Sequence, residues 1–205
     1  MINLYQIHRW DYETPIKETL IALDQLVKDK KVGHIGGSNM WTWQLAKSLW
    51  ICNDLDLERF ETIQTHYNLC YREEEREMIP FCEDQNISIL PYNPVAKGFL
   101  SGKYNRNTKN ESVRFKTDPG LAAKFFKPED FDVLDMVIQI ANEKDVKPAQ
   151  IAIAWLLTKT ITSPIIGVTK KSHVEEAVDA LDIKLTNDDI KRLEEPYQVH
   201  SINHL

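Results

Sequence analysis

Cysteine is scarce in this sequence, and the three cysteines present, Cys52, Cys70 and Cys82, form no C-x-x-C pair. An odd number without paired spacing excludes a disulfide framework and a zinc site, so we expect unreactive free thiols in a reducing compartment. Long apolar runs are also lacking. The longest, such as residues 151–157, fall far short of the roughly 20 residues that span a bilayer.

The first residues contain neither a basic region nor a long apolar core, which predicts neither a secretory signal nor a transit peptide. An excess of basic charge is absent as well, because the net charge is −6. This charge argues against a nucleic-acid-binding surface and against a surface for anionic membranes. We therefore expect a cytoplasmic protein that binds neither nucleic acid nor a membrane.

What the chain does contain is typical of a folded globular protein. Of its 205 residues, 42% are hydrophobic and 27% are charged, which is enough to bury a core in one domain of medium size. No repeat, low-complexity tract or shift in composition marks a boundary. The sequence thus predicts a single domain over residues 1–205.

Short β-type runs alternate with helical patterns along the chain, which is typical of a parallel sheet. Thr14 and Pro15 have the form of a helix start, with Thr14 as the N-cap. Two capping boxes, Ser172–Glu175 and Thr186–Asp189, predict two further helix starts. The predicted strands cover residues 2–7, 32–36, 60–64, 87–91 and 164–167, and the predicted helices cover residues 15–27, 41–55, 72–83 and 128–143 and begin again at 148, 172 and 186. Residues 98–127 are polar and irregular, and loops of this length are usually functional or mobile.

The ends of the strands decide between two parallel architectures. A doubly wound sheet would carry a glycine-rich phosphate turn after its first strand, whereas residues 7–11 contain no glycine. Candidate functional residues instead follow every predicted strand, as in a βα barrel, although only five of the eight strands that close such a barrel are visible. These residues are His8, Ser38, Asn39, Gln64, Tyr92, Asn93 and Gly167.

Six segments carry a further signal through their order and spacing: residues 4–11, 31–39, 64–69, 91–102, 147–157 and 164–169. Together they resemble the aldo-keto reductase family, and within it the fungal members similar to aryl-alcohol dehydrogenases. The resemblance implies a (β/α)8 TIM-type barrel, of which this chain contains about strands 4–8 with their helices. It also implies an NADP-dependent oxidoreductase, an alcohol dehydrogenase or aldehyde reductase acting on a CH–OH group. Such an enzyme transfers hydride between NADPH and a small aldehyde or alcohol.

The family's catalytic tetrad consists of Tyr, Lys, Asp and His. The tyrosine is the general acid, and the histidine orients the carbonyl and stabilises charge on its oxygen. By the resemblance, His8 is the tetrad histidine. The other three belong to βα units before the point where this sequence begins, so we expect an N-terminally truncated barrel without them. Tyr5 is no substitute, because side chains three residues apart on a strand point to opposite faces.

The resemblance also implies which residues bind the cofactor. Ser38, Asn39 and Gln64 match the polar side chains that hold the nicotinamide carboxamide, and Tyr92 matches the aromatic ring that stacks on the nicotinamide. The loop over the pyrophosphate is matched by Asn93, Val95, Lys97, Gly98, Leu100 and Gly102, and the region around the adenosine by Gly167, Thr169, Lys171, His173 and Glu176. No metal is implied.

A positive charge near the adenosine 2′-phosphate favours NADPH over NADH. Family members often have an arginine where this chain has His173 and an asparagine where it has Ala177. The preference between the two nucleotides is therefore open.

Purely structural roles compete with several of these assignments. Ser38 and Asn39 also have the form of a helix N-cap, and Lys170 and Lys171 could be ordinary surface lysines. His34 and His66 are expected to be packing residues rather than ligands. Residues 73–75 form a charged first helical turn that complements the helix dipole, and Trp41, Trp43 and Trp50 pack on a helix with one or two of them exposed.

Three functional hypotheses stay open. The chain could be a working oxidoreductase, a nucleotide-binding remnant without chemistry, or a truncated gene product. Five parallel strands cannot close a barrel, so unpaired edges predict marginal stability, aggregation or oligomerisation.

Overall fold

The computed structural model describes residues 1–104, 106 and 127–200. The described residues divide into two units. The first unit holds residues 1–66 and 74–90, and the second holds residues 67–73 and 91–200. Most of the long segment predicted as a loop, residues 107–126, lies outside the described part of the chain.

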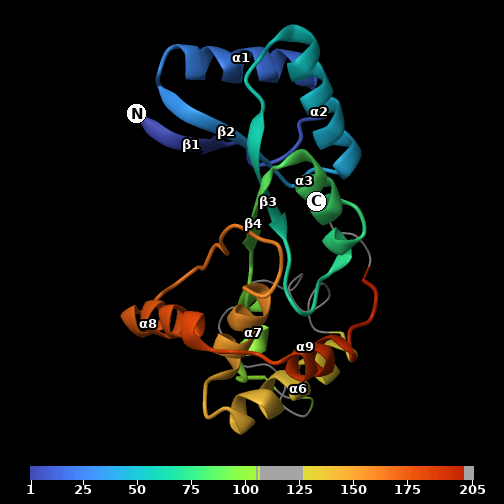
Figure 1. Ribbon diagram of the computed structural model, residues 1–205, viewed down its shortest axis with the longest axis vertical. Coiled ribbons are helices and arrows are strands. Elements are labelled where there is room, and N and C mark those ends of the chain that lie inside the picture. Colours follow the sequence, from blue (N-terminus) through green and yellow to red (C-terminus); the bar gives the residue numbers. More distant parts are fainter. Residues whose placement is uncertain (105, 107–126, 201–205) are drawn as a thin grey trace. The chain divides into compact units, whose positions relative to one another are not determined.

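A sheet of four strands organises the first unit (Figure 1). Its strands are β1 (Ile2–Gln6), β2 (Val32–Ser38), β3 (Phe60–His66) and β4 (Ser88–Tyr92), whose last two residues belong to the second unit. The strands lie in the order β1-β2-β3-β4, and the first two neighbouring pairs are parallel. Consecutive strands therefore lie side by side, as in a βα barrel, whereas a doubly wound sheet reverses its order. The expected incomplete barrel is confirmed.

Amphipathic helices follow the first three strands. They are α1 (Ile16–Lys28), α2 (Thr42–Leu55) and α3 (Met78–Gln85). The apolar stripe of α1 faces inward through Ile16, Leu20 and Leu23, and α1 packs on β2 and α2. The core of this unit contains Leu20, Val32, Ile35, Leu45, Phe60, Ile63, Cys82 and Ile89.

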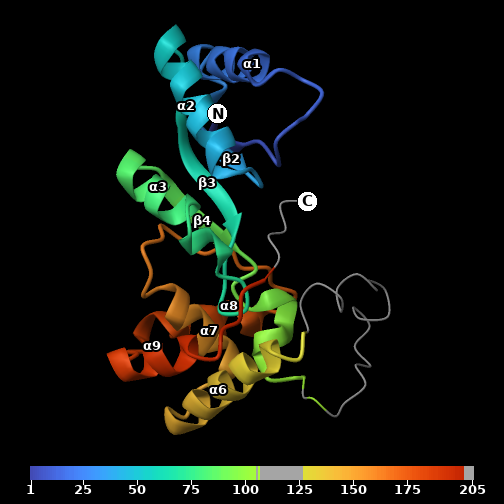
Figure 2. The ribbon, with the colours of Figure 1, turned by 90° about the vertical axis from the view of Figure 1, so that its right-hand side faces the viewer.

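The second unit is mainly helical (Figure 2). It contains the 3-10 helix η2 (Ala96–Ser101), α6 (Asp130–Glu143), α7 (Pro148–Leu156), α8 (Lys171–Asp179), the 3-10 helix η3 (Ala180–Asp182) and α9 (Asn187–Glu194). Helix α6 packs on α7 and α9, and α7 also packs on η2 and α8. Large apolar side chains fill the interior: Phe99, Leu100, Leu134, Val137, Ile140, Ile151, Trp155 and Leu193. No helix in the described residues is long and apolar enough to cross a bilayer.

The predicted fifth strand is wrong. Residues 164–167 form only one parallel bridge, between Tyr92 and Ile165, with the Ile165 N–H donating to the Pro91 carbonyl at 2.7 Å. Pro164 has no N–H to donate, which disfavours a longer ladder.

Two of three predicted helix caps are also wrong. Pro15, not Thr14, is the N-cap of α1, and α8 begins at Lys171, so Ser172 lies inside the helix. Glu175, the expected partner of Ser172, pairs with Lys171 instead. The third cap is confirmed. Thr186 accepts from the Asp189 N–H at 3.1 Å, and Asp189 accepts from the Thr186 N–H at 2.8 Å.

The acidic helix predicted for residues 72–83 is shorter than expected. Residues Glu73–Glu75 form the 3-10 turn η1, and α3 begins only at Met78. Glu73 is buried rather than solvated, because distant donors satisfy its carboxylate. The Tyr197 hydroxyl donates to it at 2.6 Å and the His200 N–H at 3.0 Å.

A second buried contact anchors the same C-terminal segment. The His200 ring lies 2.9 Å from the Asp130 carboxylate, and both side chains are almost fully buried. The other oxygen of Asp130 accepts from the Lys127 N–H at 3.0 Å, at the start of α6. Residues 197–200 are thus fixed both to the segment that follows β3 and to α6.

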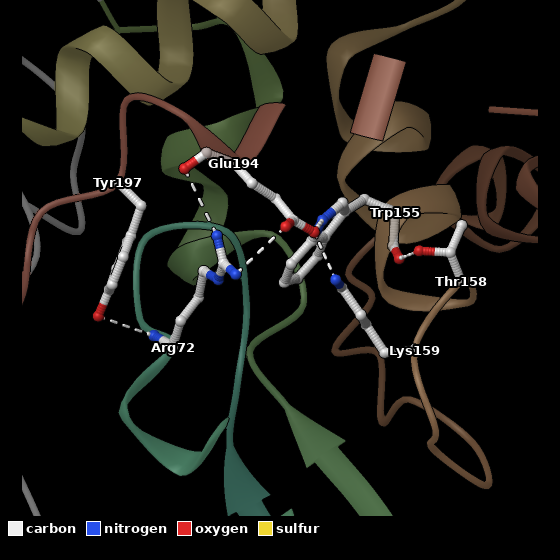
Figure 3. A network of polar contacts seen from close by, with 6 residues as sticks. All are labelled: Arg72, Trp155, Thr158, Lys159, Glu194 and Tyr197. Carbon is white, nitrogen blue, oxygen red and sulfur yellow. Dashed lines mark hydrogen bonds and ion pairs between the residues drawn. The ribbon is translucent and has the colours of Figure 1, made fainter. Parts of the chain in front are cut away.

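The end of α9 is attached through a polar network around Glu194 (Figure 3). The Glu194 carboxylate accepts from the Trp155 indole at 2.9 Å, from Arg72 at 3.3 Å and from Lys159. The Arg72 guanidinium also lies over the rings of Trp155 and Tyr197. Partial burial opposes the charged form of Glu194, but the bonds from Lys159 and Trp155 and the charge of Arg72 outweigh it, so its pKa is lowered.

We expect Glu194→Gln to lower the free energy of unfolding at neutral pH by about 1–3 kcal/mol, because hydrogen bonds to a charged group are lost. A lowered pKa stabilises the fold above the unfolded value, and this contribution disappears as the pH falls through the folded value. The variant and the parent should therefore converge once the pH falls below the lowered pKa of Glu194 in the folded state. Urea unfolding at several pH values measures both effects.

The matched control is Glu175→Gln, since Glu175 is exposed and its ion-pair partner among residues 1–104, 106 and 127–200 is the exposed Lys171. This control should change the free energy of unfolding by less than about 0.5 kcal/mol. An equal loss at all pH values for Glu194→Gln would contradict the role assigned to its charge.

Candidate active site

The carboxyl ends of three strands in the first unit bring four of the predicted residues together. Ser38 lies beside Gln64 in the register of β2 and β3, and the Asn39 N–H donates to the Gln64 carbonyl at 3.3 Å. The Asn39 side-chain amide donates to the His8 carbonyl at 2.9 Å and to the Ser38 hydroxyl at 3.1 Å. The Asn39 amide thus connects the ends of β1 and β2.

The alternative N-cap role of Ser38 and Asn39 is wrong. Helix α2 begins at Thr42, its N-cap is Trp41, and the Trp41 N–H donates to the Gln44 side chain at 2.8 Å. Ser38 and Asn39 therefore precede the helix cap. Asn39 has a left-handed backbone (φ 47°), a conformation that asparagine tolerates better than most residues.

The residues of this group differ in exposure. Ser38 is buried, Asn39 and Gln64 are half-buried, and the His8 ring is exposed. The sheet end therefore presents a hydroxyl, two amides and an imidazole. These groups are neutral donors and acceptors, together with a group that can carry a proton.

Two further polar side chains, which were not predicted, contact the same group: Gln6 lies two positions before His8, and Thr62 lies two positions before Gln64. The Gln6 side chain donates to the Thr62 hydroxyl at 2.9 Å and accepts from the Gln64 amide at 3.2 Å. Strand alternation places residues 6 and 8, or 62 and 64, on one face, so this contact could have been anticipated once the register was known.

The expectation for the two other histidines holds for one of them. His66 is buried, whereas His34 is exposed on β2, so a packing role is wrong for His34. His34 points away from its buried neighbour Ile35, because successive side chains of a strand lie on opposite faces. Within the described residues, no group of His, Cys, Asp and Glu is arranged to hold a metal ion.

In the second unit, Tyr92 and Asn93 follow the end of β4. Tyr92 forms the bridge to Ile165, which brings it near the segment that carries Gly167. The Asn93 carbonyl accepts from the Asn68 side chain at 3.0 Å, and Asn68 is buried. Asn68 was not among the predicted residues, although it lies inside the segment 64–69 that carries the family resemblance.

The loop after Tyr92 has an unusual backbone. Asn93, Ala96 and Lys97 have φ values of 58°, 47° and 55°, a region that side chains rarely adopt, and Gly98 and Gly102 have φ values of 95° and 77°. Three non-glycine residues in this region within five positions indicate strain, and strain of this kind concentrates at ligand-binding loops. Val95 and Lys97 are half-buried, while the Leu100 side chain is fully buried in the core.

The glycines of this loop and of the following segment have different surroundings. A Cβ at Gly102 would come within 2.9 Å of Pro148, so Gly102 is required for packing on α7. A Cβ at Gly98 or Gly167 would meet no atom within 4 Å. The backbone is therefore open to a ligand at these two positions.

The residues predicted around the adenosine lie at the start of α8. Thr169 and Lys171 are exposed, and His173 and Glu176 are half-buried. Glu176 forms an ion pair with Lys147, and its carbonyl accepts from Gln150, so it attaches α8 to α7.

The pKa of Glu176 is lowered, mainly by the hydrogen bond from Lys147 and further by the charges of Lys147, His173 and Lys103, against the opposing effect of burial. Lys147 and Lys103 add positive charge that the sequence analysis missed, because they lie far from α8 in the sequence.

The cysteines match expectation. All three are buried free thiols, and burial raises the pKa of Cys52 to about 11 and that of Cys82 to about 12. Such thiols are protonated at neutral pH and are poor nucleophiles.

Comparison with known proteins assigns these residues to a family. The model of the aldo/keto reductase family matches residues 1–198. Versiconal hemiacetal acetate reductase of Aspergillus parasiticus is 38% identical over an alignment of 207 positions, which covers 98% of this chain and 59% of the relative. The "Putative aryl-alcohol dehydrogenase AAD16" of Saccharomyces cerevisiae is 38% identical over 200 residues, with 96% of this chain and 57% of the relative covered.

A third relative, the aldo-keto reductase AMT2 of Alternaria alternata, is 35% identical over 198 residues, which are 96% of this chain and 53% of that protein. The chain thus spans a little more than half the length of these three relatives.

The two open glycines provide a test of the strained loop. Gly98→Ala should lower the free energy of unfolding by about 1 kcal/mol or more, because alanine is strained at a positive φ. Gly167→Ala is the matched control, since it adds the same methyl group to open space at an ordinary φ, and it should change stability by less than about 0.5 kcal/mol. Urea unfolding measures both variants. Equal effects would show that the backbone of Gly98 is not strained for alanine.

Proposed function

The chain belongs to the aldo/keto reductase family, and from this premise we propose that it is an NADP-dependent oxidoreductase acting on an aldehyde or the corresponding alcohol. The observation that carries the proposal is the convergence of Ser38, Asn39 and Gln64 at one sheet end. Because the chain spans little more than half of its relatives, activity, cofactor and substrate are proposals for it.

The residues present fit a nicotinamide cofactor. A carboxamide has one acceptor and two donor hydrogens, and the hydroxyl of Ser38 with the amides of Asn39 and Gln64 offers both kinds of partner without a net charge. The open backbone at Gly98 and Gly167 fits close approach of a phosphate or sugar. When bound, NADPH would supply the hydride that reduces the carbonyl carbon.

The remaining cofactor assignments follow the family. Tyr92 would stack on the nicotinamide, and the loop of Asn93, Val95, Lys97, Gly98, Leu100 and Gly102 would cover the pyrophosphate. Because the Leu100 side chain is buried, only its backbone could take part. The residues around the adenosine would be Gly167, Thr169, Lys171, His173 and Glu176, with Lys147 and Lys103 adding positive charge.

We propose His8 as the catalytic histidine of this chain. Its ring is exposed at the end of β1, and its backbone carbonyl is held by Asn39. An imidazole N–H there would donate to the carbonyl oxygen of the substrate, orient it and stabilise negative charge on it. The names of two relatives, a hemiacetal acetate reductase and an aryl-alcohol dehydrogenase, support an aromatic or related carbonyl compound as the substrate class.

A second candidate is nucleotide binding without turnover. It is favoured because His8 is the one member of the Tyr, Lys, Asp and His tetrad matched in the 205 residues. General acid catalysis contributes about 100- to 10,000-fold to a rate, so a chain without the tyrosine would reduce carbonyls slowly. The residues proposed to bind the cofactor do not include the tetrad tyrosine, so nucleotide binding does not require it.

We further propose that this chain forms a single barrel-type domain that associates through its open edge. In the described part of the chain, strand β1 pairs with β2 alone, and its Ile2 and Tyr5 side chains are exposed. Residues 1–7 contain neither the charges nor the proline with which proteins usually protect an edge strand. The expected cytoplasmic location stays a prediction.

Thermal unfolding with NADPH and with NADH tests the cofactor proposal. At about 100 times its Kd, a ligand adds about 2.7 kcal/mol to the stability, so a bound nucleotide should raise Tm measurably. Lys171→Ala and His173→Ala should reduce the shift from NADPH more than the shift from NADH, because each removes a partner of the 2′-phosphate. Lys184→Ala, at an exposed position between η3 and α9, is the control. Equal losses for both nucleotides would refute the 2′-phosphate assignment.

Activity is the second test. We expect the 205-residue chain to reduce an aromatic aldehyde at a rate at least about 100-fold below that of a full-length relative, because it lacks the general acid. NADPH consumption at 340 nm, a standard absorbance assay, is an adequate readout at about micromolar enzyme. His8→Ala should abolish the residual rate, with His34→Ala as the control. A rate equal to that of the Aspergillus reductase would overturn the expectation.

A further inference from the structure

A glutamine outside the predicted set lies at the centre of the polar group in the first unit. Gln6 projects from β1 and makes two hydrogen bonds to β3, two strands away: its Nε2 donates to the Thr62 Oγ1 at 2.9 Å, and its Oε1 accepts from the Gln64 Nε2 at 3.2 Å. All three side chains are half-buried. Gln6 therefore makes specific contacts across the intervening strand.

A glycine in the intervening strand makes this contact possible. Gln6 lies beside Gly36 in the register of β1 and β2, and Gly36 lies beside Thr62 in the register of β2 and β3. A Cβ at Gly36 would stand 2.1 Å from the Thr62 Oγ1 and 3.0 Å from the Gln6 Cγ. Any other residue at this position would separate the two side chains, so the gap at Gly36 is part of the arrangement.

The consequence is a defined orientation of the Gln64 amide. A glutamine amide can present either its NH₂ group or its oxygen, and a free side chain samples both. In the structure the Gln6 Oε1 accepts from the Gln64 NH₂ group, and this orientation holds while the Gln6 NH₂ group donates to the Thr62 hydroxyl. Within the described residues, this is the one hydrogen bond that the Gln64 side chain makes, and it leaves the Gln64 Oε1 available as an acceptor.

We propose that Gln6 is a positioning residue for cofactor binding, which turns the Gln64 oxygen toward the NH₂ group of the nicotinamide carboxamide. The inference rests on the proposed function, because it presupposes that Gln64 binds the nicotinamide. Gln6 acts through Gln64 and touches no substrate. A purely structural role, in which Gln6 only links β1 to β3, is the alternative to be distinguished.

The affinities for two ligands distinguish the positioning role of Gln6 from a purely structural one. NADP⁺ carries the nicotinamide, whereas adenosine 2′,5′-bisphosphate carries the same 2′-phosphate and adenosine without it. Gln6→Leu removes both hydrogen bonds at similar volume, and it should weaken NADP⁺ about fivefold, the effect of one neutral hydrogen bond of about 1 kcal/mol, while leaving the bisphosphate within about twofold. Isothermal titration calorimetry measures both affinities.

Two further variants sharpen the comparison. Gln6→Glu keeps an acceptor for the Gln64 NH₂ group, so NADP⁺ affinity should stay within about twofold of the parent. Gln25→Leu is the matched control, because Gln25 is an exposed glutamine on α1 whose amide donates to Asp29 at 2.7 Å. It should change neither affinity.

The outcomes are distinguishable. A parent chain that binds neither ligand would refute the proposed function, and one that binds the bisphosphate and NADP⁺ equally would refute the nicotinamide assignment of Gln64. Equal weakening of both ligands by Gln6→Leu, or no weakening of either, would overturn the positioning role. If Gln6→Leu does not fold, Gln6→Glu and Gln6→Lys decide, because glutamate keeps an acceptor for the Gln64 NH₂ group and lysine removes it. NADP⁺ affinity lowered in Gln6→Lys alone, with bisphosphate affinity unchanged, supports the positioning role, and equal NADP⁺ affinities in the two variants overturn it.

Discussion

In the first unit, the register of three parallel strands is the constraint on which the candidate site depends. It sets Gln6, Gly36 and Thr62 side by side in one row, and Ser38 beside Gln64 in the next. A slip of one residue in any pair would turn an entire set of these side chains to the opposite face. The register is held by the core on the other side of the sheet, where Ile35 and Ile63 are fully buried. Apolar packing on one face therefore determines the polar chemistry on the other.

In the second unit, the candidate residues lie on loops and at a helix start rather than on a sheet, so strand register does not position them. Loops are held in place by what lies beneath them. Here Phe99 and Leu100 are anchored in the core, and the buried amide of Asn68 bonds the Asn93 carbonyl. The polar network around Glu194 and the buried pair of His200 and Asp130 fix the C-terminal segment to the same unit. The strained backbone at Ala96 and Lys97 can persist because buried Phe99 and Leu100 on one side and the Asn68–Asn93 hydrogen bond on the other hold the loop.

The sequence predicted the alternation of strands and helices and the residues at the strand ends, because period-2 and period-3.6 patterns are local properties. It failed where a long-range contact overrides a local one. Glu73 has the local form of a solvated helical turn, yet Tyr197 and His200 satisfy it inside the structure. Ser172 has the spacing of a cap, yet α8 begins before it. Gln6 was missed for the same reason, since its partners Thr62 and Gln64 are more than fifty positions away and become neighbours only through the register.

Binding and chemistry are physically separable in this chain. The candidate cofactor contacts are a hydroxyl, amides and open backbone, whose orientation depends on packing and register that the 205 residues contain. In the proposed function, transition-state stabilisation needs a proton donor beside the reacting oxygen, a role separate from that of Ser38, Asn39 and Gln64. Orientation by these three residues would favour bound cofactor whether or not a proton can be delivered, so it would lower the binding free energy without lowering the chemical barrier. Nucleotide affinity and carbonyl reduction would therefore measure two different parts of the proposed site.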